Sequence, residues 1–204
     1  MTTWVTDPGG GRPRGIRGLV RTWVEVLVRP RRFFRTRIAP GDQAPGLVFA
    51  VVVALAYVLG RLASGGGAVP ATLPVVGGTG ALATLFLVLA VALVVAPATL
   101  HLAAALQTLL LIPAVRDRGG VSETVQTLAY ATAPCALAGA PVPELRALCA
   151  LYGAALLVVG LREVHGTGLV RAALAGVVPA ALVFGYAFRG FAAAGAVLSA
   201  WGPP

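Results

Sequence analysis

The chain has 204 residues, of which 58% are hydrophobic and only 11% are charged, and its net charge is +9. Because a typical soluble domain is about one quarter charged, this composition excludes an ordinary water-soluble protein. The length suits one domain, so the sequence predicts a small integral membrane protein.

The first 43 residues form a basic arm before the first long apolar run. Nine arginines lie in it: Arg12, Arg14, Arg17, Arg21, Arg29, Arg31, Arg32, Arg35 and Arg37. A basic segment can bind nucleic acid, but this one adjoins a membrane anchor, which favours the anionic headgroups of a lipid bilayer and argues against a nucleic-acid partner. The use of Arg without any Lys, with abundant Ala, Gly and Val, also indicates a GC-rich prokaryotic genome.

Part of the arm has the pattern of an amphipathic helix. After a stretch rich in Gly, Pro and Arg at residues 1–14, apolar residues recur at spacings of three and four, with charged residues on the other side. The apolar set is Ile16, Leu19, Val20, Trp23, Val24 and Leu27, and the charged set is Arg17, Arg21, Glu25 and Arg29. This pattern predicts a helix that lies in the cytoplasmic membrane interface. We expect Pro30 to end it, with Phe33 and Phe34 at headgroup level.

Five apolar segments follow, at residues 46–64, 80–112, 124–140, 145–161 and 168–188. A bilayer core of about 30 Å needs roughly 17–25 apolar residues in a helix. The second segment is too long for one crossing and too short for two with a turn, which predicts one long helix, tilted or kinked at Pro97. The third is short, Ala-rich and contains Pro134, so we expect its neighbours to shield it from lipid.

The arginines that flank these segments predict their orientation. Thirteen lie on the side of the arm, namely the nine above with Arg116, Arg118, Arg162 and Arg171, and three lie on the other side, namely Arg61, Arg146 and Arg189. Because positive residues favour the inner side, we expect a multi-pass protein of the cell membrane with its N-terminus inside and its C-terminus outside. The expected fold is all-α: an arm at 1–43, a bundle of five transmembrane helices at 44–189 and an apolar tail at 190–204.

The motifs of membrane enzymes are missing from the sequence. An intramembrane protease needs a Ser/His, Asp/Asp or His-Glu-x-x-His arrangement, whereas Ser122 and Ser199 lie at predicted helix ends and no two carboxylates share a helix interior. The glycines at 65–67 and 77–80 lie in an outer loop without the Lys of a phosphate-binding loop. We therefore expect no enzymatic activity, no cofactor and no metal site.

Some residues of the apolar segments are functional candidates, because polar groups are costly inside a membrane. His101 and Gln107 lie on the second segment, Thr127 and Tyr130 lie on the third, and Glu163 follows the fourth. If they met in one cavity, the chain would be a small transporter or channel. For His101 and Gln107 we favour hydrogen bonds at the interface or between helices.

Small residues in the last segments have two interpretations. Cys135 and Cys149 lie near the outer turn and could face each other, either as small apolar side chains, which we favour, or as a disulfide. Small-residue stripes, Ala172, Gly176 and Ala180 on one helix and Gly153 and Gly160 on another, allow helices to pack closely. We favour packing within the chain over a dimer face.

The loop between the fourth and fifth segments reads Gly-Leu-Arg-Glu-Val-His-Gly-Thr-Gly at residues 160–168. We expect Glu163 to pair with Arg162, Arg171 or an arginine of the arm, and His165 to help to fix the turn at the glycine that follows it. The alternative is a surface that binds a partner.

This loop resembles the C-terminal signature of prokaryotic Yip-domain membrane proteins, relatives of the eukaryotic Yip family that interacts with Rab GTPases. Arg29-Pro30-Arg31-Arg32-Phe33-Phe34 resembles the Pro-x-x-Phe element before their first helix. Ser122-Glu123-Thr124, with Ala129-Tyr130-Ala131 and Pro134, resembles the opening of their third helix. The resemblance covers roughly residues 28–189 and implies a five-helix Yip-type fold with a cytoplasmic N-terminus. It also implies a role as a scaffold or in membrane organisation, with a protein partner or a second copy of the chain as candidate partners.

Overall fold

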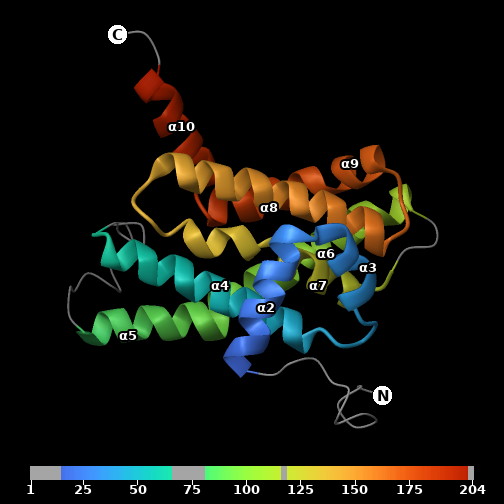
Figure 1. Ribbon diagram of the computed structural model, residues 1–204, viewed down its shortest axis with the longest axis horizontal. Coiled ribbons are helices and arrows are strands. Elements are labelled where there is room, and N and C mark those ends of the chain that lie inside the picture. Colours follow the sequence, from blue (N-terminus) through green and yellow to red (C-terminus); the bar gives the residue numbers. More distant parts are fainter. Residues whose placement is uncertain (1–14, 66–80, 116–118, 202–204) are drawn as a thin grey trace.

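A computed structural model describes residues 15–65, 81–115 and 119–201. The first fourteen residues, most of the Gly-rich outer loop, and Arg116 and Arg118 lie outside the described residues. Within the described ranges the chain is helical and contains no strand (Figure 1). The all-α class predicted from the sequence is therefore confirmed.

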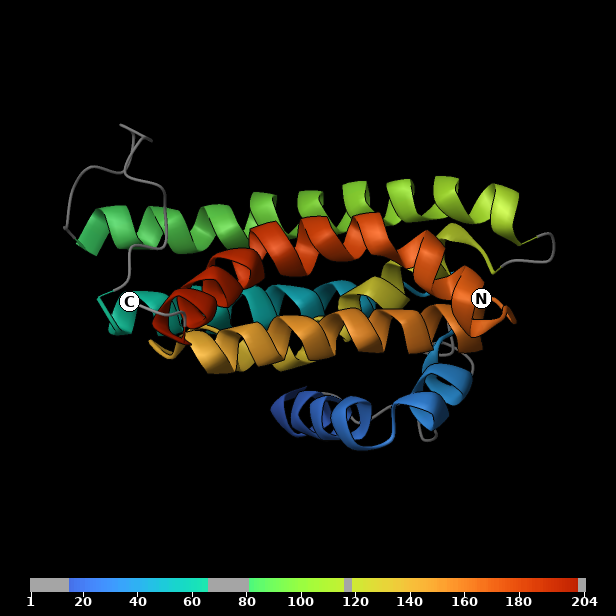
Figure 2. The ribbon, with the colours of Figure 1, turned by 90° about the horizontal axis from the view of Figure 1, so that it is seen from above.

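Four helices are long and apolar enough to cross a membrane: Ala44–Ala63, Ala83–Pro113, Pro143–Val164 and Leu169–Ala187. They lie side by side along the long axis of the molecule (Figure 2). They correspond to the first, second, fourth and fifth apolar segments predicted above. The apolar faces that the bundle leaves uncovered suit contact with lipid, as on the helix Ala83–Pro113, where only 11% of the most apolar part is buried.

The third predicted segment is different, because it is short and enclosed. It consists of α7 (Val121–Ala131) and the 3₁₀ helix η3 (Ala133–Leu137). Pro134 follows the end of α7, where its missing N–H and fixed φ favour a break in the helix. Residues 124–135 are all buried, and they pack against α4 (Ala44–Ala63), α6 (Ala96–Ala114) and α8 (Pro143–Val164). The expected shielding by neighbours is confirmed.

The second segment is one long helix, as predicted, and it has a defect next to Pro97. It runs through α5 (Ala81–Ala90), the π-helical turn η2 (Val91–Val95) and α6. Pro97 cannot donate to the carbonyl of Leu93, and the chain widens just before it, with the N–H of Ala96 bonded to Val91. The last crossing repeats this feature, because α9 (Leu169–Ala180) contains Pro179 and continues as the π helix η4 (Ala181–Ala187).

The turn between η3 and α8 is held by the side chain of Arg146 and by close contacts of its backbone with α4. Arg146, which is buried, donates from Nε to the carbonyl of Ala138 and from Nη2 to that of Ala140, both at 2.9 Å. A Cβ at Gly139 would lie 2.4 Å from the carbonyl oxygen of Tyr57 and 3.0 Å from the Cα of Gly60. Glycine is therefore required where this turn meets α4.

The predicted small-residue positions on α8 pack within the chain. A Cβ at Gly153 would lie 2.5 Å from the ring of Phe184, and one at Gly160 would lie 2.6 Å from Thr127. Ala172 and Gly176 of α9 are buried as well. The last helix, α10 (Gly190–Trp201), starts against α8 and then projects away from the bundle toward the C-terminus (Figure 1).

Two helices of the arm are described, α2 (Gly15–Val28) and α3 (Pro30–Arg37). Figure 1 shows α2 running across the direction of α4 and α8, and Figure 2 shows it on one side of the bundle. The described part of the arm is therefore docked on the bundle.

Candidate functional site

Helix α3 joins the arm to the bundle through two phenylalanines. Pro30 occupies the first turn, where a missing N–H costs nothing and the fixed φ suits a helix. Phe33 and Phe34 lie one turn later and are only 2% and 1% exposed. The ring of Phe33 packs edge-on against Tyr130 with centroids 4.9 Å apart. Phe34 lies against Gly160, where a Cβ would be 3.0 Å from its ring. The Pro-x-x-Phe element thus places its aromatic residues in the core, and the expectation that they lie at headgroup level was wrong.

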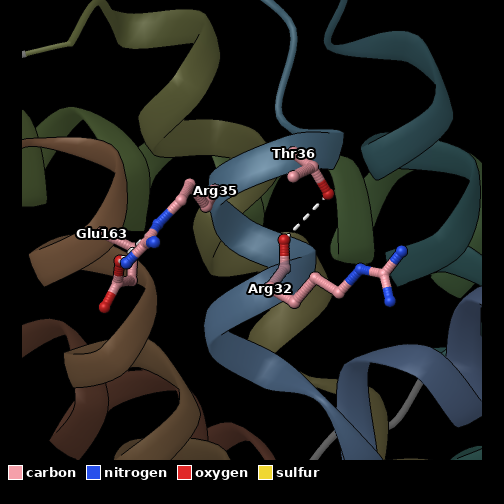
Figure 3. Close-up of polar contacts among 4 residues, drawn as sticks. All are labelled: Arg32, Arg35, Thr36 and Glu163. Carbon is pink, nitrogen blue, oxygen red and sulfur yellow. Dashed lines mark hydrogen bonds and ion pairs between the residues drawn. The ribbon is translucent and has the colours of Figure 1, made fainter.

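Polar contacts on the other faces of α3 reinforce this docking. Arg35 donates from Nη2 and Nε to Oε2 of Glu163 on α8, at 2.8 and 3.2 Å (Figure 3). The carboxylate is the buried partner, since its side chain is 9% exposed against 70% for Arg35. The amide of Gln126 donates to the carbonyl of Ala39 at 2.7 Å and accepts from the N–H of Ala39 at 3.2 Å. The segment after α3 is therefore fixed to α7.

Helix α2 is held by two side chains that donate to backbone carbonyls. Nε1 of Trp23 donates to the carbonyl of Ala133 at 2.7 Å, and the hydroxyl of Tyr152 on α8 donates to the carbonyl of Leu27. Both rings combine an apolar body with a polar tip, which suits a membrane interface. The sequence reasoning missed Tyr152 and Gln126 as site residues, although each is a polar side chain in an apolar or buried helix.

The bundle covers only one side of the apolar stripe predicted on α2. Gly18 and Val26 of α2 are buried, and Leu19, Trp23 and Leu27 of the stripe pack against the core. Of the predicted stripe, Ile16, Val20 and Val24 are 80%, 55% and 46% exposed. These three residues follow one another at steps of four and so share one side of the helix. Helix α2 therefore keeps an apolar face that the protein does not cover.

The loop after α8 has the turn expected from its sequence. Gly166 adopts a φ of 59°, and the N–H of Thr167 donates to the carbonyl of Arg162 at 3.2 Å. His165 is 2% exposed, and its Nε2 lies 3.5 Å from Oγ1 of Thr124. Of the partners considered for Glu163, the structure has Arg35 of the arm. Arg171 is exposed on α9.

The polar candidates of the membrane segments do not converge. His101 is exposed, and its Nδ1 lies 2.8 Å from the carbonyl of Pro97 in its own helix. Gln107 is buried and donates to the carbonyl of Ala175 on α9 at 2.8 Å. Thr127 donates to the carbonyl of Glu123, one turn earlier in α7. Each of these side chains thus completes a local or interhelical hydrogen bond.

The described residues show no metal cluster and no disulfide. They contain no group of three or more His, Cys, Asp or Glu side chains placed to hold a metal ion. Cys135 and Cys149 are both buried and free, with Sγ of Cys135 3.9 Å from the carbonyl oxygen of Cys149. Both cysteines are thus small buried side chains, and Cys135 lies against the backbone of Cys149.

These features define a multi-pass helical membrane protein with an N-terminal arm docked on its bundle. The family model of the Yip1 domain matches residues 24–189, from α2 to the end of the last crossing. The chain therefore belongs to the Yip1 domain family, as its motifs indicated. No curated protein and no solved structure shows significant similarity to it.

Proposed function

We propose that this Yip-type protein is a non-enzymatic scaffold that organises the cell membrane, and that its arm lies in the cytoplasmic interface against anionic headgroups. One observation carries the proposal: α2 is fixed to the side of the bundle, yet Ile16, Val20 and Val24 remain uncovered. A helix that lies in the plane of a bilayer buries such a face among acyl chains and keeps its arginines at the headgroups.

The position of the arginines supports this arrangement. Arg17 and Arg21 are exposed on α2, and Arg31 and Arg32 are exposed on α3. Helix α2 runs across the bundle axis beside the middle of α8, where Tyr152 holds it, and α3 continues to the end of α8 that carries Glu163 (Figure 1). Each arginine near an anionic surface adds about 1 kcal/mol of attraction, screened within a Debye length.

A scaffold is favoured over a transporter because the buried polar side chains are used for internal hydrogen bonds. A transporter needs polar groups around a cavity near the middle of the membrane. Here Gln107 donates a hydrogen bond to a backbone carbonyl of α9, and Gln126 donates one to a backbone carbonyl of the arm. Thr124 and Thr132 donate to backbone carbonyls three or four residues earlier in the chain. The transporter remains the alternative that the experiment must test.

The proposal includes five membrane segments, with α7 and η3 as the shielded third one. The five then alternate in direction, which places the N-terminus inside and the C-terminus outside, in keeping with the arginine bias. A membrane protein partner or a second copy of the chain would bind to this scaffold from within the bilayer.

Full-length protein in liposomes tests the proposal. We expect vesicles that stay tight to ions and small solutes but change in size and curvature, as measured by flux assays and cryo-electron microscopy. The double variant Ile16→Ser/Val20→Ser should abolish the change in shape, because it removes two of the three residues of the uncovered face of α2. The control Val121→Ser/Leu137→Ser alters exposed apolar residues of α7 and η3 and should leave it intact. Specific solute flux without a change in shape would overturn the scaffold and support a transporter.

A further inference from the structure

A groove lies between α2 and α3. Its volume is about 590 Å³, and it is lined by Arg21, Val24, Glu25, Val28, Arg29, Arg32 and Arg37. Arg37 pairs with Glu25 at 3.3 Å, which offsets one positive charge. The other three arginines are exposed. The groove is therefore strongly basic and attracts an anion.

The walls of this groove are held in place. Trp23 and Tyr152 fix α2 to the bundle, and Phe33 and Phe34 fix α3. At the corner between the helices, the N–H of Arg29 donates to the carbonyl of Glu25, and the N–H of Phe33 donates to the carbonyl of Arg29. The two helices thus meet at a defined bend, which presents the arginines to a ligand without a loss of backbone freedom.

The two arginines of α3 that Figure 3 draws have opposite tasks. Arg35 points to Glu163 on α8, whereas Arg32 extends from the other side of α3. Arg32 lines the groove. Arg35 therefore helps to hold α3 on α8, whereas Arg32 is available to a ligand in the groove.

The groove also has an apolar part, which identifies the kind of ligand. Val24 and Val28 line it and are 46% and 69% exposed. A soluble phosphate would use the arginines and leave these valines in water. An amphiphile uses both, because its anionic head takes the guanidinium groups and its hydrocarbon covers the valines.

We propose that the groove between α2 and α3 binds one anionic phospholipid, with its phosphate among Arg21, Arg29 and Arg32 and its hydrocarbon along Val24 and Val28. This inference rests on the proposed function in one respect, namely that the arm lies at the bilayer surface. It goes further by assigning a defined site, in which the position of each arginine matters and not only the net charge. Guanidinium groups suit this role, since they bind phosphate oxygens in pairs.

Four exposed arginines of the arm provide matched variants. Arg29 and Arg32 line the groove, whereas Arg17 and Arg31 lie on the same two helices and do not. The variants Arg29→Gln/Arg32→Gln and Arg17→Gln/Arg31→Gln remove the same charge from the same segment. If the lipid is attracted only by the diffuse positive charge of the arm, the two variants should lose the same affinity for it. If the groove is a defined site, the variant at Arg29 and Arg32 should lose more.

The experiment titrates full-length protein in neutral detergent with phosphatidylglycerol, phosphatidylcholine and inorganic phosphate, and follows bound lipid by native mass spectrometry. We expect one tightly bound phosphatidylglycerol, little phosphatidylcholine, and no competition from millimolar phosphate. The groove variant should lose affinity by roughly tenfold or more, the loss expected for two charge-assisted contacts. The control variant should lose less than about twofold.

Three results would overturn the proposal: equal losses in the two variants, absence of a bound phosphatidylglycerol, or displacement by phosphate, which would indicate a site for a free anion. Unchanged melting temperatures show that the variants are folded. The liposome assay separates the two proposals. If the protein binds no lipid in the groove but still reshapes vesicles, the groove alone is refuted. If lipid binds in the groove and the reshaping survives Ile16→Ser/Val20→Ser, at two residues that do not line the groove, the function of the stripe alone is refuted.

Discussion

Gln107 of α6 donates its side-chain amide to the backbone carbonyl of Ala175 in α9, at 2.8 Å. Ala175 lies four residues before Pro179, whose missing N–H leaves that carbonyl without its helical donor. In a membrane such a carbonyl must be satisfied from within the protein. Gln107, a functional candidate by its polarity, therefore completes the hydrogen bonding of a helix that proline interrupts.

The first prediction follows from this pair. Gln107→Leu should lower the free energy of unfolding by about 1–2 kcal/mol, because it leaves a buried carbonyl without a donor. Pro179→Ala supplies the missing N–H, so Gln107→Leu should cost much less in that background. Thermal unfolding in detergent of the wild type, the two single variants and the double variant gives the interaction free energy between positions 107 and 179. Additive effects would show that the amide does not compensate for the proline.

The second prediction concerns the ion pair between Arg35 and Glu163. Glu163→Gln should lower stability by less than about 1 kcal/mol, because Arg35 is largely exposed and water screens the pair. The arm should nevertheless loosen, and cleavage between α3 and α4 in limited proteolysis should become faster. Arg171→Gln, at an exposed arginine of α9, is the control and should not change the cleavage rate. Loss of co-purifying proteins at unchanged stability would instead identify the loop as a binding surface.

The third prediction concerns the turn between η3 and α8. Gly139→Ala should destabilise the protein by about 1–3 kcal/mol, because its Cβ would overlap the backbone of Tyr57 and Gly60. At Gly195 of α10 an added Cβ meets nothing within 4 Å. Gly195→Ala is thus the matched control, and in a helix it should be neutral or slightly stabilising. Equal melting temperatures for the two variants would show that the turn can move away from α4.

The fourth prediction concerns topology. Reporters fused to the two termini should lie on opposite sides of the membrane, with the N-terminus inside, if α7 and η3 act as a crossing. Apart from α7 and η3, four helices have the length and hydropathy needed to cross a membrane. Four crossings would put both termini on one side. Fusions of alkaline phosphatase and of green fluorescent protein to each terminus decide between five membrane crossings and four.

Sequence alone determined that the chain is a helical membrane protein, and it located the apolar segments, the long helix near Pro97 and the shielded third segment. These properties depend on local features, namely the length and hydropathy of a run and the presence of a proline. Short motifs such as Pro30 with Phe33 and the loop at Glu163 also indicated the family that the family model then matched.

Only the tertiary structure decided how the arm is used. Trp23 and Ala133 are 110 positions apart, and Arg35 and Glu163 are 128 apart. Helical periodicity in α2 showed an apolar stripe but not which part of it the bundle would cover. The bundle covers Leu19, Trp23 and Leu27 together with Gly18 and Val26, and it leaves Ile16, Val20 and Val24 exposed. Such contacts depend on how distant helices are turned and placed against one another. That arrangement arises from the packing of the whole bundle, whereas periodicity describes each helix by itself.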